Sequence, residues 1–336
     1  MSRPDSTRSA GTDSESTPKW DEPLTSLPPL SEHPLVSVIV PSYNRDTYLR
    51  ETLESILCQE YDHIEIIVVD GASTDQSLDI LHSYGHEPRI RWISEPDSGP
   101  IEALSKGYKL ATGELTGQLP VTDTYFPEAI KELVQEFTQS PSLAFVGGWN
   151  QEINEHGIPT NRPALPNKRI DYSLDDIIHL AGFPNAQATL YRRDIALAVT
   201  GFDEHDQESH GVFNLSYMLE ASKRGGHVRA IPKVLANYRI HDNQRHTSNE
   251  HGGLTAVIQR TRGTHEQANK YRNFLTPHQV KTLRRTGYFF ELRYRLRTRK
   301  YSAGALPALM GYIRFGGGPH VIKKLCARML RPLGIH

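Results

Sequence analysis

The sequence predicts an α/β fold in which helices flank a mostly parallel central sheet, with a helical extension at the C-terminal end. Two observations carry this prediction. Short β-branched runs, such as 36–40 and 64–70, alternate with stretches whose apolar residues recur at helical spacing, which is typical of βαβ units. Beyond residue 250 the pattern is helical and basic.

Composition excludes several other classes of protein. The chain has 336 residues, 37% of them hydrophobic, which allows two domains or one large domain with tails and excludes wholesale disorder. Mean hydropathy is −0.51, and no run of about 18 residues is apolar and uncharged, so no membrane-spanning helix is predicted. The two cysteines, Cys58 and Cys326, are too few for a disulfide scaffold and favour a reducing, cytoplasmic location.

Residues 1–34 predict a disordered leader, because Ser, Thr and Pro make up half of them. Trp20 and the stretch 24–30 could dock loosely on the body. Order is expected from residue 35, and Asn44 is a candidate N-cap of the first helix. The predicted strands are 36–40, 64–70, 89–94 and 115–119, and the helices between them centre on 49–57, 78–81 and 101–110.

From about residue 126 the alternation is less regular. The segment 150–175 is expected to be a loop-rich connection. The other predicted elements are a helix near 126–138, a strand at 143–146, helices near 193–199 and 213–224, and a short strand at 228–231. These patterns divide the chain into a leader at 1–34, an α/β domain at 35–248 and a basic helical extension at 249–336.

The chemically informative residues follow the predicted strands. Pro41–Arg45, Asp70–Ser73 and Glu95–Gly99 come directly after the first three strands, so they could line one crevice at the carboxyl edge of the sheet. Tyr43 offers a face on which a base could stack, and Asp70 offers a carboxylate for ring N–H groups or ribose hydroxyls. The competing interpretation is that these are ordinary turn residues. Neither a dinucleotide-binding glycine motif nor a P-loop is present.

The order and spacing of several strings resemble inverting family 2 glycosyltransferases of the WcaA-like, cell-surface polysaccharide type. The resemblance covers roughly residues 35–248 and implies the GT-A nucleotide-diphospho-sugar transferase fold. The strings that carry it are 36–45, 66–75, 94–99, 103–107, 111–114, 187–193, 201–204 and 238–241.

The resemblance implies roles for the strand-end residues. The loop after the first strand and the acid after the second would hold the nucleotide, with Asp97 near the ribose or diphosphate. The usual metal-binding acid falls on Thr122, and Asp123 is the surviving carboxylate, so Mn²⁺ or Mg²⁺ binding through Asp123 and His241 is in doubt. The candidate nucleotide-binding residues are Pro41, Ser42, Tyr43, Arg45, Asp70, Asp97 and Thr122.

The acceptor side also departs from the family. Inverting transfer needs a carboxylate as base, but both alignment registers of the expected helix place neutral residues at the acidic positions, Asn214 among them. Asp206 and Glu208 are the nearest substitutes. The resemblance places Gln187 and Asn214 near the acceptor.

Charge is distributed unevenly. Residues 281–336 carry 13 Lys and Arg and one acid, Glu291, whereas the rest of the chain carries 25 bases and 38 acids. The basic tail, with an amphipathic stretch at 321–330, could bind an anionic membrane surface or dock on the acidic body; nucleic acid is not an expected partner.

Taken together, the sequence predicts transfer of a sugar from a nucleotide-sugar donor, with a UDP-sugar favoured, to a glycan or glycolipid precursor. The enzyme would be cytoplasmic, with peripheral association at the inner face of the membrane. The alternative is a catalytically impaired GT-A-fold protein that acts as a scaffold for an active transferase. A nucleotidyltransferase is disfavoured, because 41–45 is not a glycine-rich basic loop.

Overall fold

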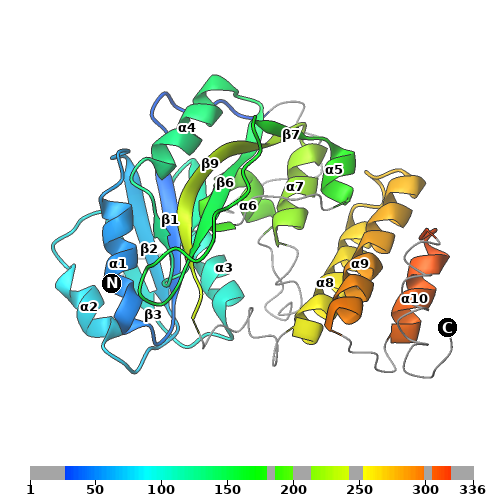
Figure 1. Ribbon diagram of the computed structural model, residues 1–336. Helices are drawn as coiled ribbons and strands as arrows, with labels where there is room; N and C mark the ends of the chain where they lie inside the picture. Colours follow the sequence, from blue (N-terminus) through cyan, green and yellow to red (C-terminus); the bar gives the residue numbers. More distant parts are fainter. Residues whose placement is uncertain (1–26, 180–185, 200–212, 242–252, 299–304, 319–336) are drawn as a thin grey trace, which may run out of the picture.

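A single mixed sheet organises the structure, a computed structural model that describes residues 27–179, 186–199, 213–241, 253–298 and 305–318 (Figure 1). Its strands follow the order β3-β2-β1-β4-β8-β6-β9-β5, and β7 pairs with β9 outside this path. The sheet is parallel where the order begins and mixed from β8 onward.

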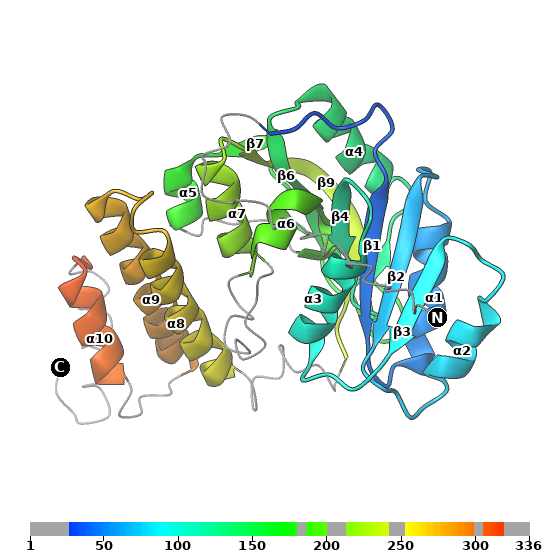
Figure 2. The ribbon, with the colours of Figure 1, turned by 180° about the vertical axis from the view of Figure 1, so that it is seen from behind.

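The parallel half follows the sequence prediction closely. Strands β1 (Val36–Ser42), β2 (Ile64–Asp70), β3 (Ile90–Ser94) and β4 (Leu115–Gln118) lie side by side, and α1 (Asp46–Leu57), α2 (Ser77–Ser83) and α3 (Pro100–Leu110) connect them. Figures 1 and 2 show α1 and α2 on one face of these strands and α3 on the other. Burial on both faces explains why β1 and β2 are nearly continuous apolar runs.

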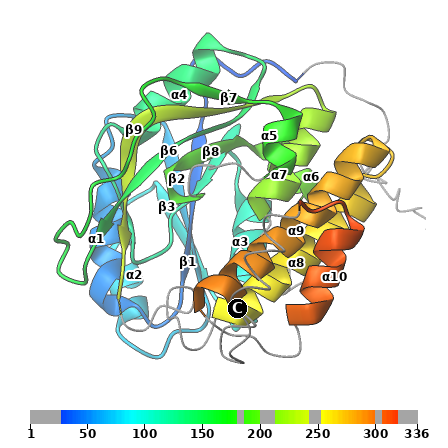
Figure 3. The ribbon, with the colours of Figure 1, turned by 45° about the vertical axis from the view of Figure 1, so that its right-hand side comes forward.

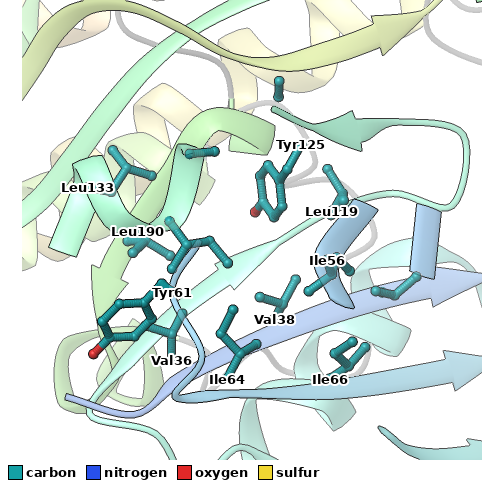
Figure 4. Packing of buried hydrophobic residues seen from close by; sticks show 14 of the residues in the cluster. Val36, Val38, Ile56, Tyr61, Ile64, Ile66, Leu119, Tyr125, Leu133 and Leu190 are labelled. Atoms are coloured by element: carbon teal, nitrogen blue, oxygen red, sulfur yellow. The ribbon is translucent and has the colours of Figure 1, made fainter. Parts of the chain in front are cut away.

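Side chains of β1 alternate between two cores. Val36, Val38 and Val40 pack with Leu53 and Ile56 of α1, and Figure 4 shows this cluster around Val38 and Ile56. Ile39 points to the opposite face, where it joins a second cluster with Tyr108 of α3. A strand buried on both faces has no freedom to slip by one residue, so the positions of its end residues are fixed.

The second half of the sheet differs from the prediction. It contains β5 (Thr124–Tyr125), β6 (Leu143–Ile153), β7 (Ile170–Tyr172), β8 (Thr189–Arg192) and β9 (His227–Arg239). The strand expected at 228–231 is present but longer than predicted, because β9 has 13 residues. The expected loop at 150–175 contains the end of β6 and all of β7. β5 and β8 were not predicted, because they are short strands held by antiparallel pairing to distant segments.

The remaining helices of this half are short. They are α4 (Ala129–Gln139), α5 (Leu174–Ile178), the 3₁₀ turn η1 (Ala186–Ala188), α6 (Arg193–Val199) and α7 (Phe213–Lys223). α4, α6 and α7 lie where helices were predicted. α4 packs through Leu133 and Phe137 on the same core as α1, whereas α6 and α7 cover the α3 face.

Three helices form the C-terminal extension: α8 (Gly253–Lys270), α9 (Pro277–Thr298) and α10 (Ala305–Arg314). Figure 3 shows them side by side next to α5 and α7. Tyr271, Leu275 and Leu283 belong to the same hydrophobic cluster as Tyr217 of α7. None of the helices in the described part of the chain is long and apolar enough to cross a membrane. The amphipathic stretch 321–330 lies outside the described residues.

The last residues of the predicted leader contact the body. Leu27 and Leu30 pack against the two main hydrophobic clusters. The Arg192 guanidinium donates to the Pro28 carbonyl at 2.5 Å, and the Tyr61 hydroxyl donates to the Pro34 carbonyl at 2.6 Å. Residues 27–34 are therefore held to the body, and contact begins before the boundary that composition placed at residue 34. Trp20 lies outside the described residues.

Candidate functional site

Three polar residues form a row at the carboxyl edge of the parallel strands. Ser42 of β1 is paired with Asp70 of β2, and Asp70 is paired with Ser94 of β3. The Asp70 carboxylate is fully buried and accepts hydrogen bonds from the Ser73 amide at 2.9 Å, the Ser73 hydroxyl at 2.5 Å and the Ser94 hydroxyl at 2.7 Å. The structure thus brings the three predicted strand-end loops together and fixes a carboxylate at their centre.

Asn44 joins two of these loops. It adopts a φ of 50°. Its side-chain oxygen accepts a hydrogen bond from the Thr74 backbone amide at 2.8 Å, and its backbone amide donates to the Ser73 hydroxyl at 2.8 Å. The expectation that Asn44 caps α1 is wrong, because the N-cap residue is Arg45, and the Asp46 amide of the first turn donates instead to the Asp75 carboxylate at 3.0 Å. The left-handed conformation, which Asn tolerates well, turns the side chain toward the loop after β2.

The loop after β1 presents one aromatic ring to solvent. Tyr43 is 53% exposed, whereas Pro41 and Ser42 are buried. The Ser42 hydroxyl has no partner within the described chain, and the Arg45 guanidinium donates to the Asn44 carbonyl at 2.9 Å. An exposed ring offers a flat face on which a nucleobase can stack.

Asp97 lies against the loop after β2. A Cβ atom at Gly71 would be only 2.9 Å from Oδ2 of Asp97, so the absence of a side chain at 71 allows this approach. Oδ1 of Asp97 accepts a hydrogen bond from the Gly99 amide at 2.8 Å. Partial burial raises the pKa of Asp97 above its usual range. The predicted ribose or diphosphate residue therefore does sit beside the predicted base-binding residue.

Asp123 is enclosed by the protein. Its side chain has no exposed surface, and its Oδ1 accepts from the Arg239 amide at 3.0 Å and lies 3.3 Å from the Thr122 hydroxyl. The Asp123 carbonyl accepts from the Thr52 hydroxyl of α1 at 2.8 Å. Burial raises the pKa of Asp123 to about 7, despite the Arg239 amide, which lowers it. This carboxylate links the loop after β4 to the end of β9.

The described residues do not fit a divalent cation at Asp123. Among them Oδ2 of Asp123 is buried and has no hydrogen-bond partner. A hard cation needs several oxygen ligands, and within the described ranges no group of three or more His, Cys, Asp and Glu side chains could hold one. His241 lies instead with its ring centroid 6.1 Å from that of Tyr48.

Arg239 is a residue that the sequence analysis missed. Its side chain is 2% exposed, donates to the Thr122 carbonyl at 2.9 Å, and pairs with Glu51 of α1 at 2.6 Å. Its guanidinium also lies 4.8 Å from the centre of the Tyr48 ring. These contacts hold the end of β9 against α1 and close the space around Asp123. The arginine of the Tyr-Arg-Ile-His string was the available signal, but nothing in the sequence indicated its partners.

Hydrogen bonds hold both predicted acceptor residues to neighbouring strands. Gln187 in η1 accepts a hydrogen bond from the Asn150 amide of β6 at 3.2 Å. Asn214, in the first turn of α7, accepts from the Tyr191 hydroxyl of β8 at 3.0 Å. The Thr189 hydroxyl lies 2.8 Å from the same phenol. Thr189 and Tyr191 belong to the string 187–193, but their contacts were not predicted, because β8 was not recognised as a strand. Nothing in the sequence indicated Asn150 of β6. Asp206 and Glu208 lie outside the described residues.

A polar row at the carboxyl ends of parallel strands lies where open α/β sheets bind their ligands. Comparison with known proteins indicates a class of enzyme. Residues 37–197 match Glycosyl transferase family 2. A chondroitin synthase of Pasteurella multocida is 33% identical over 125 residues, which cover 37% of this chain. The chain spans 13% of the length of that relative.

Solved structures agree on the fold, which is GT-A. S. aureus TarS in complex with UDP-GlcNAc has a TM-score of 0.60 at 18% identity, covering 87% of this chain and 81% of that one. The mannosyltransferase PcManGT of Pyrobaculum calidifontis, in complex with GDP-Man and Mn²⁺, has a TM-score of 0.55 at 18% identity, covering 93% of this chain and 91% of that one.

Proposed function

We propose that this chain is an inverting glycosyltransferase that moves a sugar from a nucleotide donor to a glycan or glycolipid precursor of a cell-surface polysaccharide. The row formed by Ser42, Asp70 and Ser94, with the exposed Tyr43 ring beside it, is the observation that carries the proposal. A UDP-sugar is the favoured donor, in keeping with the UDP-GlcNAc bound by TarS. A polysaccharide acceptor accords with the similarity to a chondroitin synthase.

The donor half of the site would act mainly by orientation. Tyr43 stacks on the base, and the fixed carboxylate of Asp70 accepts hydrogen bonds from the base or ribose. Asp97, held beside Gly71, lies near the ribose or diphosphate, and Thr122 offers a neutral hydroxyl further along the same edge. Because Asp70 is already fixed by three hydrogen bonds, it needs little reordering when the nucleotide binds.

The acceptor half must supply a base. In an inverting transfer the acceptor oxygen attacks the anomeric carbon, the bond to the diphosphate breaks, and the acceptor proton passes to a carboxylate. Asn214 is a neutral amide, so it can orient an acceptor hydroxyl but cannot take its proton. We therefore assign the base to Asp206 or Glu208, and the orienting contacts to Gln187 and Asn214.

The proposed donor site does not use Asp123 as a cation ligand. PcManGT was solved with Mn²⁺, but no group of three or more His, Cys, Asp and Glu side chains in the described part of this chain could hold a cation at Asp123. Nucleotide affinity should therefore depend on the edge residues 42, 70 and 97 more than on added metal.

The test is calorimetric binding of UDP, GDP and dTDP, each with Mn²⁺ and with EDTA. We expect one nucleotide to bind in both conditions and Asp70→Asn to weaken it by about tenfold or more, since a hydrogen bond to a charged group contributes roughly 1.5–3 kcal/mol. Asp79→Asn is the matched control, because Asp79 is exposed on α2. Failure of all three nucleotides to bind would overturn the proposal. Binding only with Mn²⁺ would overturn the assignment of Asp123.

The scaffold alternative has one observation in its favour. The acceptor helix carries Asn214 where a base is expected, and the surviving acid of the metal motif is enclosed. Nucleotide binding by itself does not separate the two candidates, but slow hydrolysis of the bound donor does. A transferase releases sugar from its donor at a rate that falls in the double variant Asp206→Asn/Glu208→Gln, whereas a scaffold shows no release above the uncatalysed rate.

A further inference from the structure

The outward face of α10 is apolar. Leu306, Met310 and Ile313 are 58%, 63% and 47% exposed, and their spacing of four and three residues places them on one side of the helix. They are three of the seven large hydrophobic residues exposed in the described part of the chain. The opposite side of the same helix is already packed, since Ala308 and Tyr312 contact Leu292 of α9. The exposed face is therefore not needed to hold α10 in place.

A groove lies beside this face, between α8, α9 and α10. Its volume is about 480 Å³, and Met310 contributes to both the groove and the exposed face. Arg284 and Arg314 line it, with their guanidinium carbons 5.6 Å and 5.9 Å from the centre of the Phe315 ring. The described residues that line the groove include a histidine as well as these arginines, but no carboxylate. Its chemistry favours an anionic group next to apolar material.

The helices around the groove are positively charged, like the arginines that line it. Between residues 253 and 318 the sequence contains only two acids, Glu266 and Glu291, and Glu291 is buried in an ion pair with Arg295 at 2.7 Å. Exposed cations on these helices include Lys281, Arg293 and Arg314. Residues 319–336 add four Lys and Arg and no acid. The segment that contains α10 therefore carries far more positive than negative charge, which favours an anionic partner.

We propose that α10 and its groove dock on an anionic phospholipid surface. Leu306, Met310 and Ile313 enter the boundary between headgroups and acyl chains, and Arg284 and Arg314 bind headgroup phosphates. Two other occupants fit less well. A second copy of this chain would bring the same positive charge to the contact, and a soluble anionic glycan would leave three large apolar side chains exposed to water. The proposal is independent of sugar transfer and holds whether or not the chain is catalytically active.

The experiment is flotation of the full-length protein with vesicles of phosphatidylcholine alone or of an equal mixture with phosphatidylglycerol, at low and high salt. We expect binding to the mixed vesicles at low salt, about tenfold weaker binding at high salt because charge is screened, and weak binding to neutral vesicles. No binding to the mixed vesicles at low salt overturns the proposal.

Two variants locate the surface. The triple variant Leu306→Ser/Met310→Ser/Ile313→Ser and the single variant Arg314→Gln should each reduce binding by about fivefold or more, from lost insertion or lost charge. Ile158→Ser/Leu165→Ser is the matched control, because these side chains are 59% and 42% exposed but lie far along the chain in the loop after β6. Equal loss in the control and the α10 variants, or no loss in either, overturns the assignment to α10.

Two further measurements test whether unfolding or self-association accounts for the result. Calorimetric nucleotide binding and a circular dichroism melt show whether the triple variant is folded; if it is not, Met310→Ser alone replaces it, since this side chain is the most exposed of the three. Sedimentation equilibrium without lipid tests the second copy. A dimer that the α10 variants dissociate would mean that the face binds another chain, and would overturn the membrane proposal.

Discussion

Asp123 shows how one residue can keep its place in a motif while its surroundings change what it can do. The sequence placed a carboxylate after β4 and predicted a doubtful metal ligand. The structure places it inside the protein, with Oδ1 on the Arg239 amide and Oδ2 unpartnered among the described residues. Arg239 is 116 positions away in the sequence, so no local pattern could have indicated this enclosure. The identity of the residue was predictable, whereas its burial and its raised pKa were not.

Stability should depend on pH through Asp123. Its pKa is about 7 in the folded chain, against an ordinary 3.8, so the native state holds this proton over a pH range in which the unfolded chain has lost it. The free energy of unfolding should then fall as pH rises from about 4 to about 7 and level off above. From pH 5 to pH 8 the free energy of unfolding of Asp123→Asn should rise by about 2–3 kcal/mol relative to that of wild type. Urea unfolding at the two pH values measures this.

The control for that measurement is Asp79→Asn, which removes an exposed carboxylate from α2. Its stability should follow the wild-type pH profile. If the Asp123→Asn profile also runs parallel to that of wild type, the side chain is ionised across the whole range and the described enclosure is wrong.

At the scale of elements, the parallel half of the sheet was predictable because its signals are local. Each of β1 and β2 is a continuous apolar run buried on both faces, and a turn rich in polar residues follows each one. The sequence alone was therefore enough to place the carboxyl-edge residues Ser42 and Asp70 together. The mixed half was predicted poorly, since β8 is defined by pairing with β4 and β6, and since the β6–β9 pair contains three register shifts that break a simple alternation.

The turn after β2 offers a test of the donor site. Gly71→Ala would place a Cβ 2.9 Å from the Asp97 carboxylate, and Asp97 is the flexible partner, so it should move while the fold stays intact. We expect nucleotide affinity to fall about five- to tenfold while stability changes by less than about 1 kcal/mol. Calorimetry and urea unfolding of the same sample separate the two effects.

Gly318→Ala is the matched control, because a Cβ there would meet nothing within 4 Å. Unchanged nucleotide affinity in Gly71→Ala would show that Asp97 does not contribute to the donor site. A large loss of stability would show instead that the turn cannot adjust, and that affinity fell because the protein unfolded.

At the scale of the whole molecule, composition predicted a helical extension after residue 248 but not how closely it is joined to the sheet domain. Tyr271, just after α8, is 3% exposed, and its hydroxyl lies 3.0 Å from Glu220 and 3.3 Å from the Ser216 carbonyl, both on α7. The extension and the α7 side of the sheet share one hydrophobic cluster. A change of composition marks a change of surface chemistry, and it does not mark a break in the core.

Removing the Tyr271 hydroxyl should therefore destabilise the whole protein. Tyr271→Phe leaves the cluster packed but removes a donor from the buried Glu220, so the free energy of unfolding should fall by about 1–2 kcal/mol in one cooperative transition. Tyr43→Phe, at a 53% exposed ring, is the control and should change stability little. Two separate transitions in either protein would show that the extension unfolds on its own.

The strand order has a consequence for how the chain is made. β1 to β4 come from one continuous stretch of sequence, 36–118, and within it β1 pairs with β2 and β4, and β2 with β3. β8 and β9 must return from far downstream to complete the sheet. Contacts of short sequence separation close with less loss of chain entropy, so the donor edge can assemble on the ribosome before the acceptor half has been synthesised. Asp123 is then solvated in the growing chain and is enclosed only when the last residues of β9 arrive.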